Sequence, residues 1–313
     1  MRNRGWMLGA VAALVLVAGM ATAQTAPGGQ RPGRARTGMQ RLGWRLAVQA
    51  WTFRELSLFE TIDVLKSLGV RSIEMFPGQK LSKENPVGFD HNATDAQIEA
   101  VKAKLTEARV RVVNYGVTGL GTDDAANRKV FDFAKKMGIT VIVAEPAEEA
   151  MAAIDKLCTE YSTTTYKVRV AIHNHPKPSH YWNSETVLKA VKDVSKSIGA
   201  CADTGHWVRS GLDPVAQLKA LKGRIVSLHF KDLNAKKDDA PWGTGLSNVR
   251  AQLEELKAQK CRATFSIEYE STTGAELIEN VRKCVAWFRK TCDELAPTAT
   301  AAPDGAAPTS PAP

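Results

Sequence analysis

Three observations predict a single-domain α/β fold of the (β/α)8 TIM barrel type. Eight strand-like apolar runs alternate with amphipathic helical patterns, which indicates a parallel sheet. Residues 45–295 lie between two low-complexity ends and have the usual length of an eight-fold barrel, about 250 residues. Polar residues follow nearly every run, whereas an open doubly wound sheet would gather them at one switch point. No glycine-rich phosphate fingerprint follows the first run, which also disfavours the open sheet.

The strand-like runs are short, apolar and bounded by turn residues or by helical patterns. In chain order, the predicted strands are residues 46–51, 71–76, 110–115, 139–144, 168–172, 199–202, 225–228 and 263–267.

Helical patterns fill the intervals between these strands. Thr94 and Gln97 have capping-box spacing at the start of one helix. Gly138 is placed to end the next helix, because glycine tolerates the left-handed conformation found there. Ser184 and Ser247 are predicted N-caps of two later helices.

Both ends of the chain are predicted to lie outside the barrel. Residues 1–23 resemble a signal peptide, with a basic start, a short apolar run and small residues up to Ala23. The residue directly after the cleavage point is Gln24 and not a cysteine, and the apolar run is short for a membrane span, so we expect no stable membrane anchor. An uncleaved N-terminal anchor is the alternative. Residues 24–44 are predicted to be a disordered linker and residues 296–313 a disordered Ala/Pro-rich tail. The expected location is periplasmic or secreted.

The net charge of +9 does not indicate a nucleic-acid partner. Residues 1–54 contain eight Arg and no Asp or Glu, so 9 − 8 leaves +1 for the rest of the chain. The five cysteines are an odd number and include no CxxC motif, so we expect no disulfide framework, although a single bridge stays open. Cys201, in an apolar strand, is expected to be a small buried hydrophobe.

Metal-binding and acid–base residues stand at the ends of several predicted strands. Side chains two apart on a strand face the same way, so pairs such as His173 and His175 can both point into the barrel mouth. Any one of these residues could be a hydrogen-bonded core residue, but together on one rim they indicate a site. Carboxylates and imidazoles without thiolates suit one divalent metal ion, Mn, Zn, Co or Mg. The predicted mouth comprises Glu74, Glu145, His173, His175, Asp203, His206, His229, Lys231, Glu268 and Glu270.

Three segments carry a resemblance to a known family, and they are Asp203-Thr204-Gly205-His206, His229-Phe230-Lys231-Asp232 and Glu268. They resemble the metal-site strands of the sugar phosphate isomerase/epimerase family, in the xylose isomerase-like TIM barrel superfamily. The resemblance covers about residues 45–292. It implies that Asp203, His229 and Glu268 are metal ligands. The family's fourth ligand is usually a Glu at the end of the fifth strand, where this chain has His173. Glu145, one strand earlier, is the alternative ligand or the base.

The resemblance also implies a reaction. A metal bound by neighbouring carbonyl and hydroxyl oxygens of a sugar acidifies the C–H between them and stabilises the enediolate. Glu145 and Glu268 are the candidate acid–base groups, Lys231 is expected to steady an enolate or hydroxyl, and His206 is expected to contact the substrate. The sequence therefore predicts an exported, metal-dependent isomerase or epimerase acting on a sugar or keto-sugar. Without a basic cluster to hold phosphate, the small-molecule substrate is expected to be neutral.

Alternative functions remain. A keto-sugar or keto-glycoside lyase or hydratase would use the same metal site, and His173 in place of the family Glu favours it. A non-catalytic sugar-binding barrel is a further alternative, and an endonuclease is disfavoured by the near-neutral barrel. The expected substrate contacts, including two Trp that could stack on a sugar, are Glu74, His175, Trp207, Trp242 and Glu270.

Overall fold

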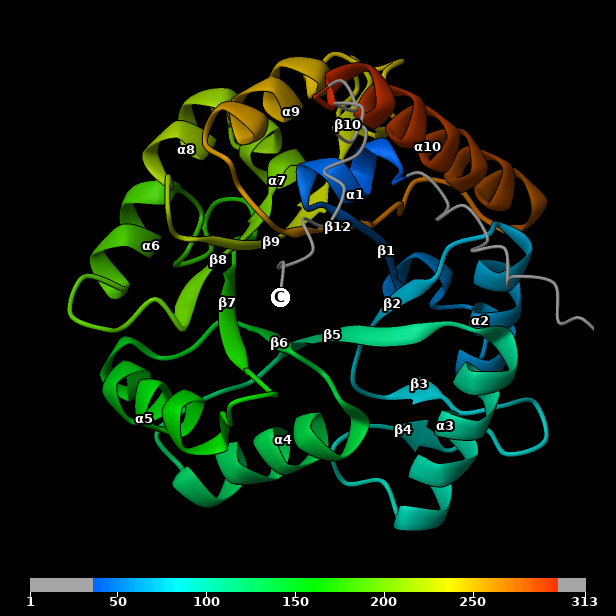
Figure 1. Cartoon of the computed structure of the whole chain (residues 1–313), viewed down its shortest axis with the longest axis vertical. Coiled ribbons are helices and arrows are strands. Elements are labelled where there is room, and N and C mark those ends of the chain that lie inside the picture. The colour runs from blue at the N-terminus through cyan, green and yellow to red at the C-terminus, as the bar shows by residue number, and fades with distance from the viewer. Residues whose placement is uncertain (1–35, 298–313) are drawn as a thin grey trace, which may run out of the picture. The chain divides into compact units, whose positions relative to one another are not determined.

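The computed structural model describes residues 36–297, and this part of the chain contains a closed barrel of eight parallel strands. Figure 1 shows the strands as an inner ring with the helices outside it. The ring order is β1-β12-β9-β8-β7-β6-β5-β2, and it closes where β1 pairs with β12, from Arg45 with Thr264 to Val48 with Ile267. The barrel strands are β1 (Arg45–Gln49), β2 (Ser72–Met75), β5 (Arg111–Thr118), β6 (Val141–Ala144), β7 (Arg169–His173), β8 (Ile198–Asp203), β9 (Ile225–Phe230) and β12 (Thr264–Ile267).

Every barrel strand is followed by helical structure, which confirms the predicted (β/α)8 TIM barrel. The helices are α2 (Leu58–Ser67), α3 (Asp95–Ala108), α4 (Asp124–Met137), α5 (Met151–Tyr161), α6 (Ser184–Ala190), α7 (Thr204–Arg209), α8 (Pro214–Ala220), α9 (Val249–Ala258) and α10 (Gly274–Leu295). Two short 3-10 helices, η1 (Ala50–Phe53) and η2 (Glu148–Ala150), lie in loops. The sequence did not predict two small hairpins, β3 (Gln79–Lys80) with β4 (Gly88–Phe89) and β10 (Asp232–Leu233) with β11 (Asp239–Ala240).

Helix caps followed the sequence in two cases and differed in two. Thr94 and Gln97 form the predicted capping box, and Gly138 ends α4 in the left-handed conformation, with φ of 71°. Ser184 is not an N-cap. The N-cap of α6 is Asn183, one residue earlier, whose side chain accepts the N–H of Thr186. Ser247 is not an N-cap either: α9 starts after Asn248, and the Ser247 hydroxyl accepts the N–H of Leu233 instead.

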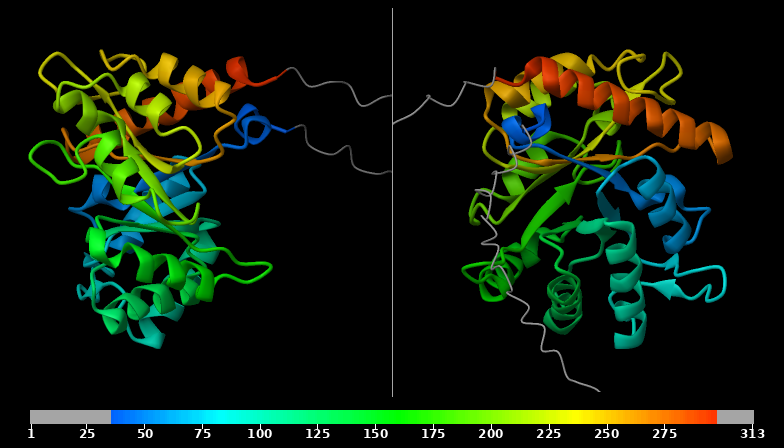
Figure 2. Two further views of the ribbon diagram at one scale, coloured as in Figure 1. Left: turned by 90° about the vertical axis from the view of Figure 1, so that its left-hand side faces the viewer. Right: turned by 45° about the vertical axis from the view of Figure 1, so that its right-hand side comes forward.

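The barrel domain begins earlier than predicted. Helix α1 (Gly38–Leu42) lies in the segment expected to be a disordered linker, and it packs beside the end of α10 (Figure 2). The backbone N–H of Gly38 donates to the Asp293 carboxylate at 2.7 Å, and Trp44 is buried in the core. The apolar and capping contacts of residues 36–44 therefore correct the linker boundary. The predicted signal peptide, the linker up to residue 35 and the tail from residue 298 lie outside the described residues.

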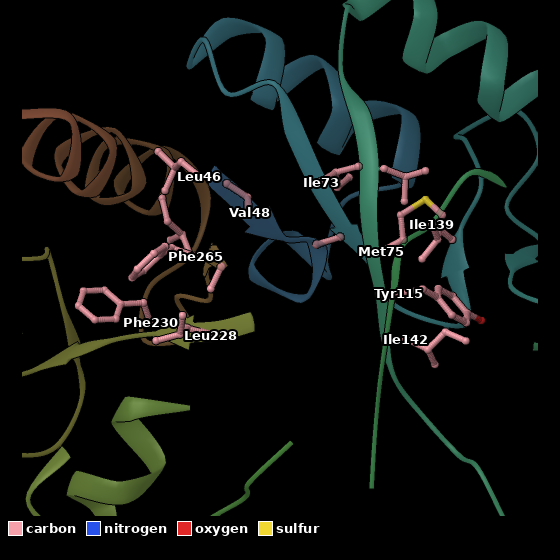
Figure 3. Packing of buried hydrophobic residues seen from close by; sticks show 14 of the residues in the cluster. Leu46, Val48, Ile73, Met75, Tyr115, Ile139, Ile142, Leu228, Phe230 and Phe265 are labelled. Atoms are coloured by element: carbon pink, nitrogen blue, oxygen red, sulfur yellow. The ribbon is translucent and has the colours of Figure 1, made fainter. Parts of the chain in front are cut away.

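The alternation of strand side chains separates two apolar clusters. The large one fills the space between strands and helices, where Val48, Ile73 and Phe265 lie (Figure 3). The small one is built on the other face of β6 to β9 and includes Ala171 and Cys201. His173 and Asp203, two residues farther along the same strands, continue this second face toward the carboxyl ends. The strand period thus directs the site residues inward.

Two further observations bear on the predictions from composition. All five cysteines are free in the structure, and Cys201 is buried as expected. Within residues 36–297, no helix is long and apolar enough to cross a membrane.

Candidate metal and active site

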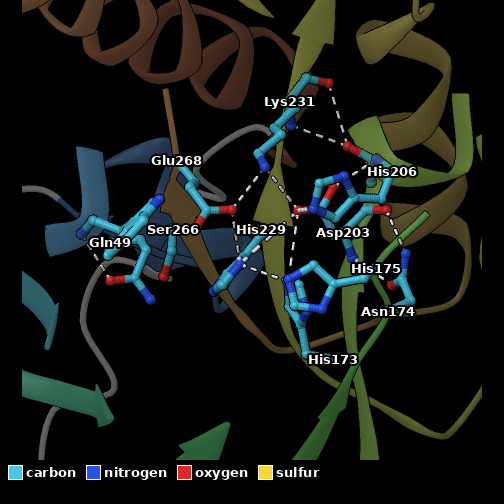
Figure 4. A network of polar contacts seen from close by, with 12 residues as sticks. Gln49, His173, Asn174, His175, Asp203, His206, His229, Lys231, Ser266 and Glu268 are labelled. Carbon is cyan, nitrogen blue, oxygen red and sulfur yellow. Dashed lines mark hydrogen bonds and ion pairs between the residues drawn. The ribbon is translucent and has the colours of Figure 1, made fainter. Parts of the chain in front are cut away.

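Four buried side chains meet at the carboxyl ends of adjacent strands (Figure 4). His173 ends β7, Asp203 ends β8, His229 lies near the end of β9, and Glu268 directly follows β12. The strands are neighbours in the ring, and Asp203 is paired in register with His229. The four residues are at most 8% exposed. Burying so many polar groups is costly unless they are used, so this cluster marks the functional end of the barrel.

The donor atoms of these four residues face one another. Nδ1 of His229 lies 3.1 Å from Nε2 of His173 and 3.1 Å from Oε2 of Glu268. Oδ2 of Asp203 lies 3.7 Å from Nε2 of His173 and 4.0 Å from Nδ1 of His229. All four donor atoms lie within 4.8 Å of one another. Around a metal with ligands at about 2.1 Å, neighbouring ligand atoms lie about 3 to 3.4 Å apart, so the set is close to that size.

Charge and hydrogen bonding also fit a divalent cation. Oδ2 of Asp203 is fully buried and faces the Lys231 ammonium at 3.0 Å, so its charge is already balanced in part by a cation. Three carboxylates, Asp203, Glu268 and Glu270, surround the single Lys231 ammonium, which is an excess of two negative charges among these four groups. A divalent ion would neutralise this excess. The residues that could hold it are His173, Asp203, His229 and Glu268.

Glu145 is not part of this donor set. Its Oε1 lies 3.5 Å from Nδ1 of His173, on the side of the ring away from Nε2, and it is hydrogen-bonded to Nδ1 of His175. Carboxylates commonly take this position beside a metal-binding imidazole, where they orient the ring. Of the two alternatives for the fourth ligand, the geometry therefore favours His173 and gives Glu145 a supporting place.

Glu74 has a different place from the substrate contact that the sequence predicted. It is fully buried below the site, and its Oε1 lies 2.7 Å from Nε2 of His229. Gln49, Asn114 and Ser266 donate further hydrogen bonds to the same carboxylate. No oxygen of Glu74 is open to a substrate. Glu74 orients His229 so that Nδ1 points to the donor cluster.

Lys231 is a fully buried ammonium at the centre of an ion-pair network. Its Nζ lies 2.7 Å from Glu268, 2.9 Å from Glu270 and 3.0 Å from Asp203. Burial alone would lower the pKa of Lys231, but Asp203 and the two glutamates raise it well above its usual value. Burial would raise the pKa of Glu268, yet Lys231 and His229 hold it well below its usual range. At neutral pH, Lys231 is therefore a cation and Glu268 a carboxylate.

His206 presents a neutral N–H to the mouth. A guanidinium has no acceptor, so the hydrogen bond of 3.2 Å from Arg209 Nη1 makes Nδ1 of His206 the acceptor. Burial, reinforced by the Lys231 charge and opposed by Asp203, lowers the pKa of His206 to about 3. The neutral ring consequently carries its proton on Nε2, which lies 3.6 Å from Oδ2 of Asp203. His206 can donate a hydrogen bond beside the candidate metal ligands.

His175 and Glu145 form an ion pair at the edge of the site. The hydrogen bond to Glu145 raises the pKa of His175 above its usual value. Burial would raise the pKa of Glu145, but its hydrogen bonds to His173 and His175 lower it to about 2. The strand before Glu145, β6, stands four positions from β12 in the ring of eight, so Glu145 and Glu268 arise from opposite sides of the mouth. Acid–base groups therefore flank the cluster on both sides.

A pocket of about 410 Å³ opens above the cluster. His173, His175, His206, Glu268 and Glu270 contribute to its wall, as the sequence predicted for a common mouth. The aromatic wall is formed by Trp51, which is 41% exposed and donates a hydrogen bond to Glu270, and by Phe76.

Trp207 and Trp242, which the sequence favoured as sugar-stacking residues, do not line this pocket. Trp207 is 1% exposed and lies in the core. Trp242 packs edge-on against Phe230 and Phe288, so protein covers its ring as well. The core position of both rings corrects the prediction, and Trp51 is the pocket aromatic instead.

Other residues in the motifs prove to shape the site, and nothing in the local pattern distinguished them. Asn174 exchanges two hydrogen bonds with the backbone of Asp203, at 2.8 and 2.9 Å, and so joins the ends of β7 and β8. Asp232 accepts the N–H groups of Gly243, Gly245 and Ser247 and orders that loop. Asn174 and Asp232 are therefore structural residues that hold the loops around the site.

Gly205 makes room for the lysine. A Cβ at this position would lie 2.8 Å from Cβ and Cδ of Lys231, closer than real Cβ atoms approach. The glycine of the Asp-Thr-Gly-His segment therefore allows α7 to pass beside the Lys231 side chain.

Comparison with known proteins decides the family. The family model described as xylose isomerase-like TIM barrel matches residues 62–291, most of the barrel. The chain belongs to this family. Over 82 residues it is 33% identical to inosose dehydratase from Lactiplantibacillus plantarum, and this match spans 26% of the chain and 27% of that protein.

Solved structures agree with the family assignment. An uncharacterised protein from Parabacteroides distasonis is 34% identical, with a TM-score of 0.65 over 79% of this chain and 99% of that one. A D-psicose 3-epimerase from Clostridium cellulolyticum is 12% identical, with a TM-score of 0.61 over 80% of this chain and 99% of its own. A probable 3-DHS dehydratase from Bacillus anthracis is 14% identical, with a TM-score of 0.60 over 78% and 98%. The last two share the fold with this protein.

Proposed function

We propose that this protein is a metal-dependent enzyme that removes a proton from the carbon next to a carbonyl of a neutral keto-sugar and then eliminates an oxygen substituent from the following carbon. The observation that carries the proposal is the placement, in the wall of one pocket, of an ionised carboxylate, Glu268, and of His175, an imidazole whose pKa is raised by its hydrogen bond to Glu145. A base on one side and an acid on the other match the two proton transfers of an elimination.

A divalent ion held by His173, Asp203, His229 and Glu268 would supply Lewis acidity toward the carbonyl and hydroxyl oxygens of the sugar. The remaining steps belong to side chains of this family member. Glu268 accepts the proton from carbon. His206 donates a hydrogen bond to the oxygen on which negative charge develops, and the buried Lys231 holds Glu268 and Glu270 in place through its ion pairs. His175, oriented by Glu145, gives its proton to the departing oxygen.

The substrate class follows from the pocket. Trp51 and Phe76 offer aromatic faces to a sugar ring, and carboxylates and imidazoles offer hydrogen-bond partners to hydroxyls. The cations nearest the pocket, Lys231 and Arg209, are already engaged by carboxylates, so they do not form a free phosphate clamp. The match to inosose dehydratase, itself an eliminating enzyme by name, supports the same reaction type.

Isomerisation or epimerisation is the second candidate, and one observation favours it. Glu145 and Glu268 come from opposite sides of the barrel mouth, as a two-sided exchange of protons at carbon requires. In this chain, however, the Glu145 carboxylate is turned to His175 and not to the pocket above the donor cluster. Because Glu145 is hydrogen-bonded to His175, we place elimination before isomerisation or epimerisation.

A product assay tests the proposal. Protein loaded with Mn²⁺ or Zn²⁺ is incubated in deuterated water with keto-sugars that carry an oxygen substituent β to the carbonyl. We expect ultraviolet absorbance from a new enone together with loss of the substituent. Deuterium incorporation with the substituent retained would instead assign the isomerase or epimerase reaction. If none of the keto-sugars reacts in the presence of metal, both the elimination and the isomerase or epimerase reaction are refuted.

We also propose that the enzyme acts after export, on the basis of the signal-like pattern in residues 1–23. The mass of the protein recovered from the periplasm of expressing cells tests this proposal. Cleavage after Ala23 is expected, and an intact N-terminus confined to the cytoplasm would contradict it.

A further inference from the structure

The amino end of the barrel, opposite the candidate site, carries a large excess of positive charge. The amino face is defined here as the segment that enters β1 and the seven turns that lead from a helix into a barrel strand, each through the first residue of its strand. These segments are residues 36–45, 68–72, 109–111, 138–141, 162–169, 191–198, 221–225 and 259–264. They contain 14 Lys or Arg and one Asp, which is a net charge of +13.

The rest of the described chain has the opposite sign. Residues 36–297 contain 38 Lys or Arg and 32 Asp or Glu, a net charge of +6. Subtracting, 6 − 13 leaves −7 for everything outside the amino face. The small net charge of the barrel is therefore the sum of two large and opposite contributions, and such a molecule has a preferred orientation toward a charged partner.

Most of the cations on the amino face have no carboxylate beside them. Among residues 36–297, Lys192 is the one cation of this face within 4.0 Å of a carboxylate, at 3.7 Å from Asp193. Arg45 and Arg111 are the first residues of their strands, so interaction with a helix end does not account for them. Burial and the neighbouring Arg111 charge lower the pKa of Arg45, as expected for two cations that lie close together. Because like charges repel, their concentration at one end favours a role in binding anions.

Three arginines of the amino face converge on one hollow. The hollow has a volume of about 240 Å³, and Arg45, Arg169 and Arg262 line it together with Thr140 and Thr264. Strands β1 and β7 stand four positions apart in the ring of eight, so arginines reach the hollow from opposite sides of the barrel. Guanidinium groups are the donors that proteins favour for phosphate oxygens. The centre of the amino face therefore suits a phosphate group.

A groove of about 490 Å³ beside the hollow extends the basic surface. Every charged residue that lines the groove is basic, and these residues are Arg36, Arg41, Lys257, Lys260 and Arg262. Pro297, at the other end of the described chain, lines the same groove. The sequence just before Arg36 adds Arg31 and Arg34. Both ends of the described chain thus lie on the amino face.

The distribution of these cations distinguishes between anionic partners. Arginines stand at or just before the starts of strands all round the ring, namely Arg45, Arg71, Arg111, Arg169, Arg224 and Arg262. A flat layer of anionic groups can meet the whole ring at once, whereas a nucleic-acid duplex is a rod that would meet the cations along one line. The ring therefore favours a flat anionic partner.

We propose that the amino face docks reversibly on a membrane that contains anionic phospholipids, with a lipid phosphate in the hollow of Arg45, Arg169 and Arg262. The pocket at the carboxyl ends of the strands then faces away from the lipid and stays open to substrate in solution. This docking does not depend on which reaction the pocket catalyses.

Vesicle binding of the full chain tests the proposal. Co-sedimentation compares phosphatidylcholine vesicles with vesicles that also contain phosphatidylglycerol. We expect partition to be at least about tenfold stronger with phosphatidylglycerol and to fall steeply as NaCl is raised from about 0.05 to about 0.5 M. The apolar run of residues 6–20 has no charge and would favour neither vesicle, so equal binding to both would overturn the proposal.

Two double variants remove the same charge from opposite ends. Arg45→Gln with Arg262→Gln acts on the hollow, and Lys80→Gln with Lys236→Gln acts on exposed loop residues that follow β2 and β9. Each cation near an anionic surface contributes about fivefold to partition, so the first pair should lower binding at least about tenfold and the second less than about twofold. Equal losses would show that net charge alone acts, and would overturn the docking face.

A reserve variant covers a failure of the first pair to fold. If its Tm falls well below that of wild type, Arg111→Gln with Lys260→Gln replaces it, because both residues are exposed and their side chains make no hydrogen bond within residues 36–297. The same loss of at least about tenfold is expected.

Other anions are tested on the same proteins. Millimolar inorganic phosphate at constant ionic strength should leave vesicle binding unchanged, and release of the protein would instead assign the hollow to a free anion. A short DNA duplex should bind more weakly than the phosphatidylglycerol vesicles. Tighter binding to the duplex, lost in Arg45→Gln with Arg262→Gln, would assign the face to nucleic acid and overturn membrane docking.

Discussion

Nε2 of His229 lies 2.7 Å from Oε1 of Glu74, and both side chains are completely buried. Because Nε2 is held by the carboxylate, Nδ1 is the nitrogen that faces Glu268 and His173. One residue beneath the site thus decides which imidazole atom is offered to a cation. The candidate metal centre therefore has two layers: the donor residues, and beneath them the residues, such as Glu74, that fix the orientation of the donors.

A conservative replacement of Glu74 is expected to lower the affinity of the site for metal. In Glu74→Gln the shape is kept but the charge that makes His229 a stronger ligand is lost, so metal affinity should fall about 10- to 100-fold. A competition titration with a chromogenic chelator measures this change. Glu99→Gln, in an exposed ion pair on α3, is the control. Unchanged affinity in Glu74→Gln would show that Glu74 does not act through His229.

Metal is expected to stabilise the fold. A ligand that binds only the native state at 100 times its Kd adds about 2.7 kcal/mol to the free energy of unfolding. Adding Mn²⁺ or Zn²⁺ should therefore raise the Tm of wild-type protein, as differential scanning fluorimetry would record. Asp203→Asn removes the charge of a buried carboxylate in the donor set, so most of this increase should disappear. An equal increase in both proteins would place the metal elsewhere.

Gly205→Ala is expected to reduce activity through Lys231. The added methyl group would come within 2.8 Å of the base of the lysine side chain, so the lysine or α7 must move. We expect kcat to fall at least about tenfold, with a loss of stability of about 1 to 3 kcal/mol from overpacking. Gly121→Ala is the matched control, because open space surrounds that position. Steady-state kinetics and urea unfolding report the two effects, and wild-type kinetics in Gly205→Ala would contradict the role given to the glycine.

The His175–Glu145 pair is expected to stabilise the protein in a limited pH window. The lowered pKa of Glu145, about 2, contributes stability above its unfolded value of 4.5 and loses it as pH falls toward 2. The raised pKa of His175 contributes stability below its unfolded value of 6.5 and loses it as pH rises through the folded value. The difference in Tm between wild type and Glu145→Gln should thus be largest between about pH 4.5 and 6.5. A difference that does not vary from pH 3 to 9 would show that the pair is not ionised.

The sequence predicted the parts of this molecule that depend on local pattern. The strand period identified all eight strands, and the polar residues at their ends, among them Asp203 and His229, meet as expected because parallel strands share one open end. His173 joined the donor set although it departs from the family's usual Glu. The period of two also explains why each of these residues points inward.

The remaining errors concern residues whose role depends on tertiary neighbours. Glu74 at the end of a strand looks the same in sequence whether it faces a substrate or lies beneath a ligand. Trp242 was expected to stack on a sugar, but Asp232 holds the loop of Gly243 and Gly245, and the Trp242 ring packs in the core. The pairing of Glu145 with His175 joins two strands across 30 positions of sequence, which no local pattern reveals.

The cluster of Asp203, His229 and Glu268 is predicted to remove a proton from the carbon beside a carbonyl. Proton NMR of a methyl 3-keto-glucoside with Mg²⁺- or Zn²⁺-loaded protein in deuterated water observes that C2 proton directly. We predict that wild-type protein removes the C2 signal by exchange or elimination, and that Asp203→Asn and Glu268→Gln leave it in place. A C2 signal that persists with metal-loaded wild-type protein, or that disappears equally with both variants, would contradict the account.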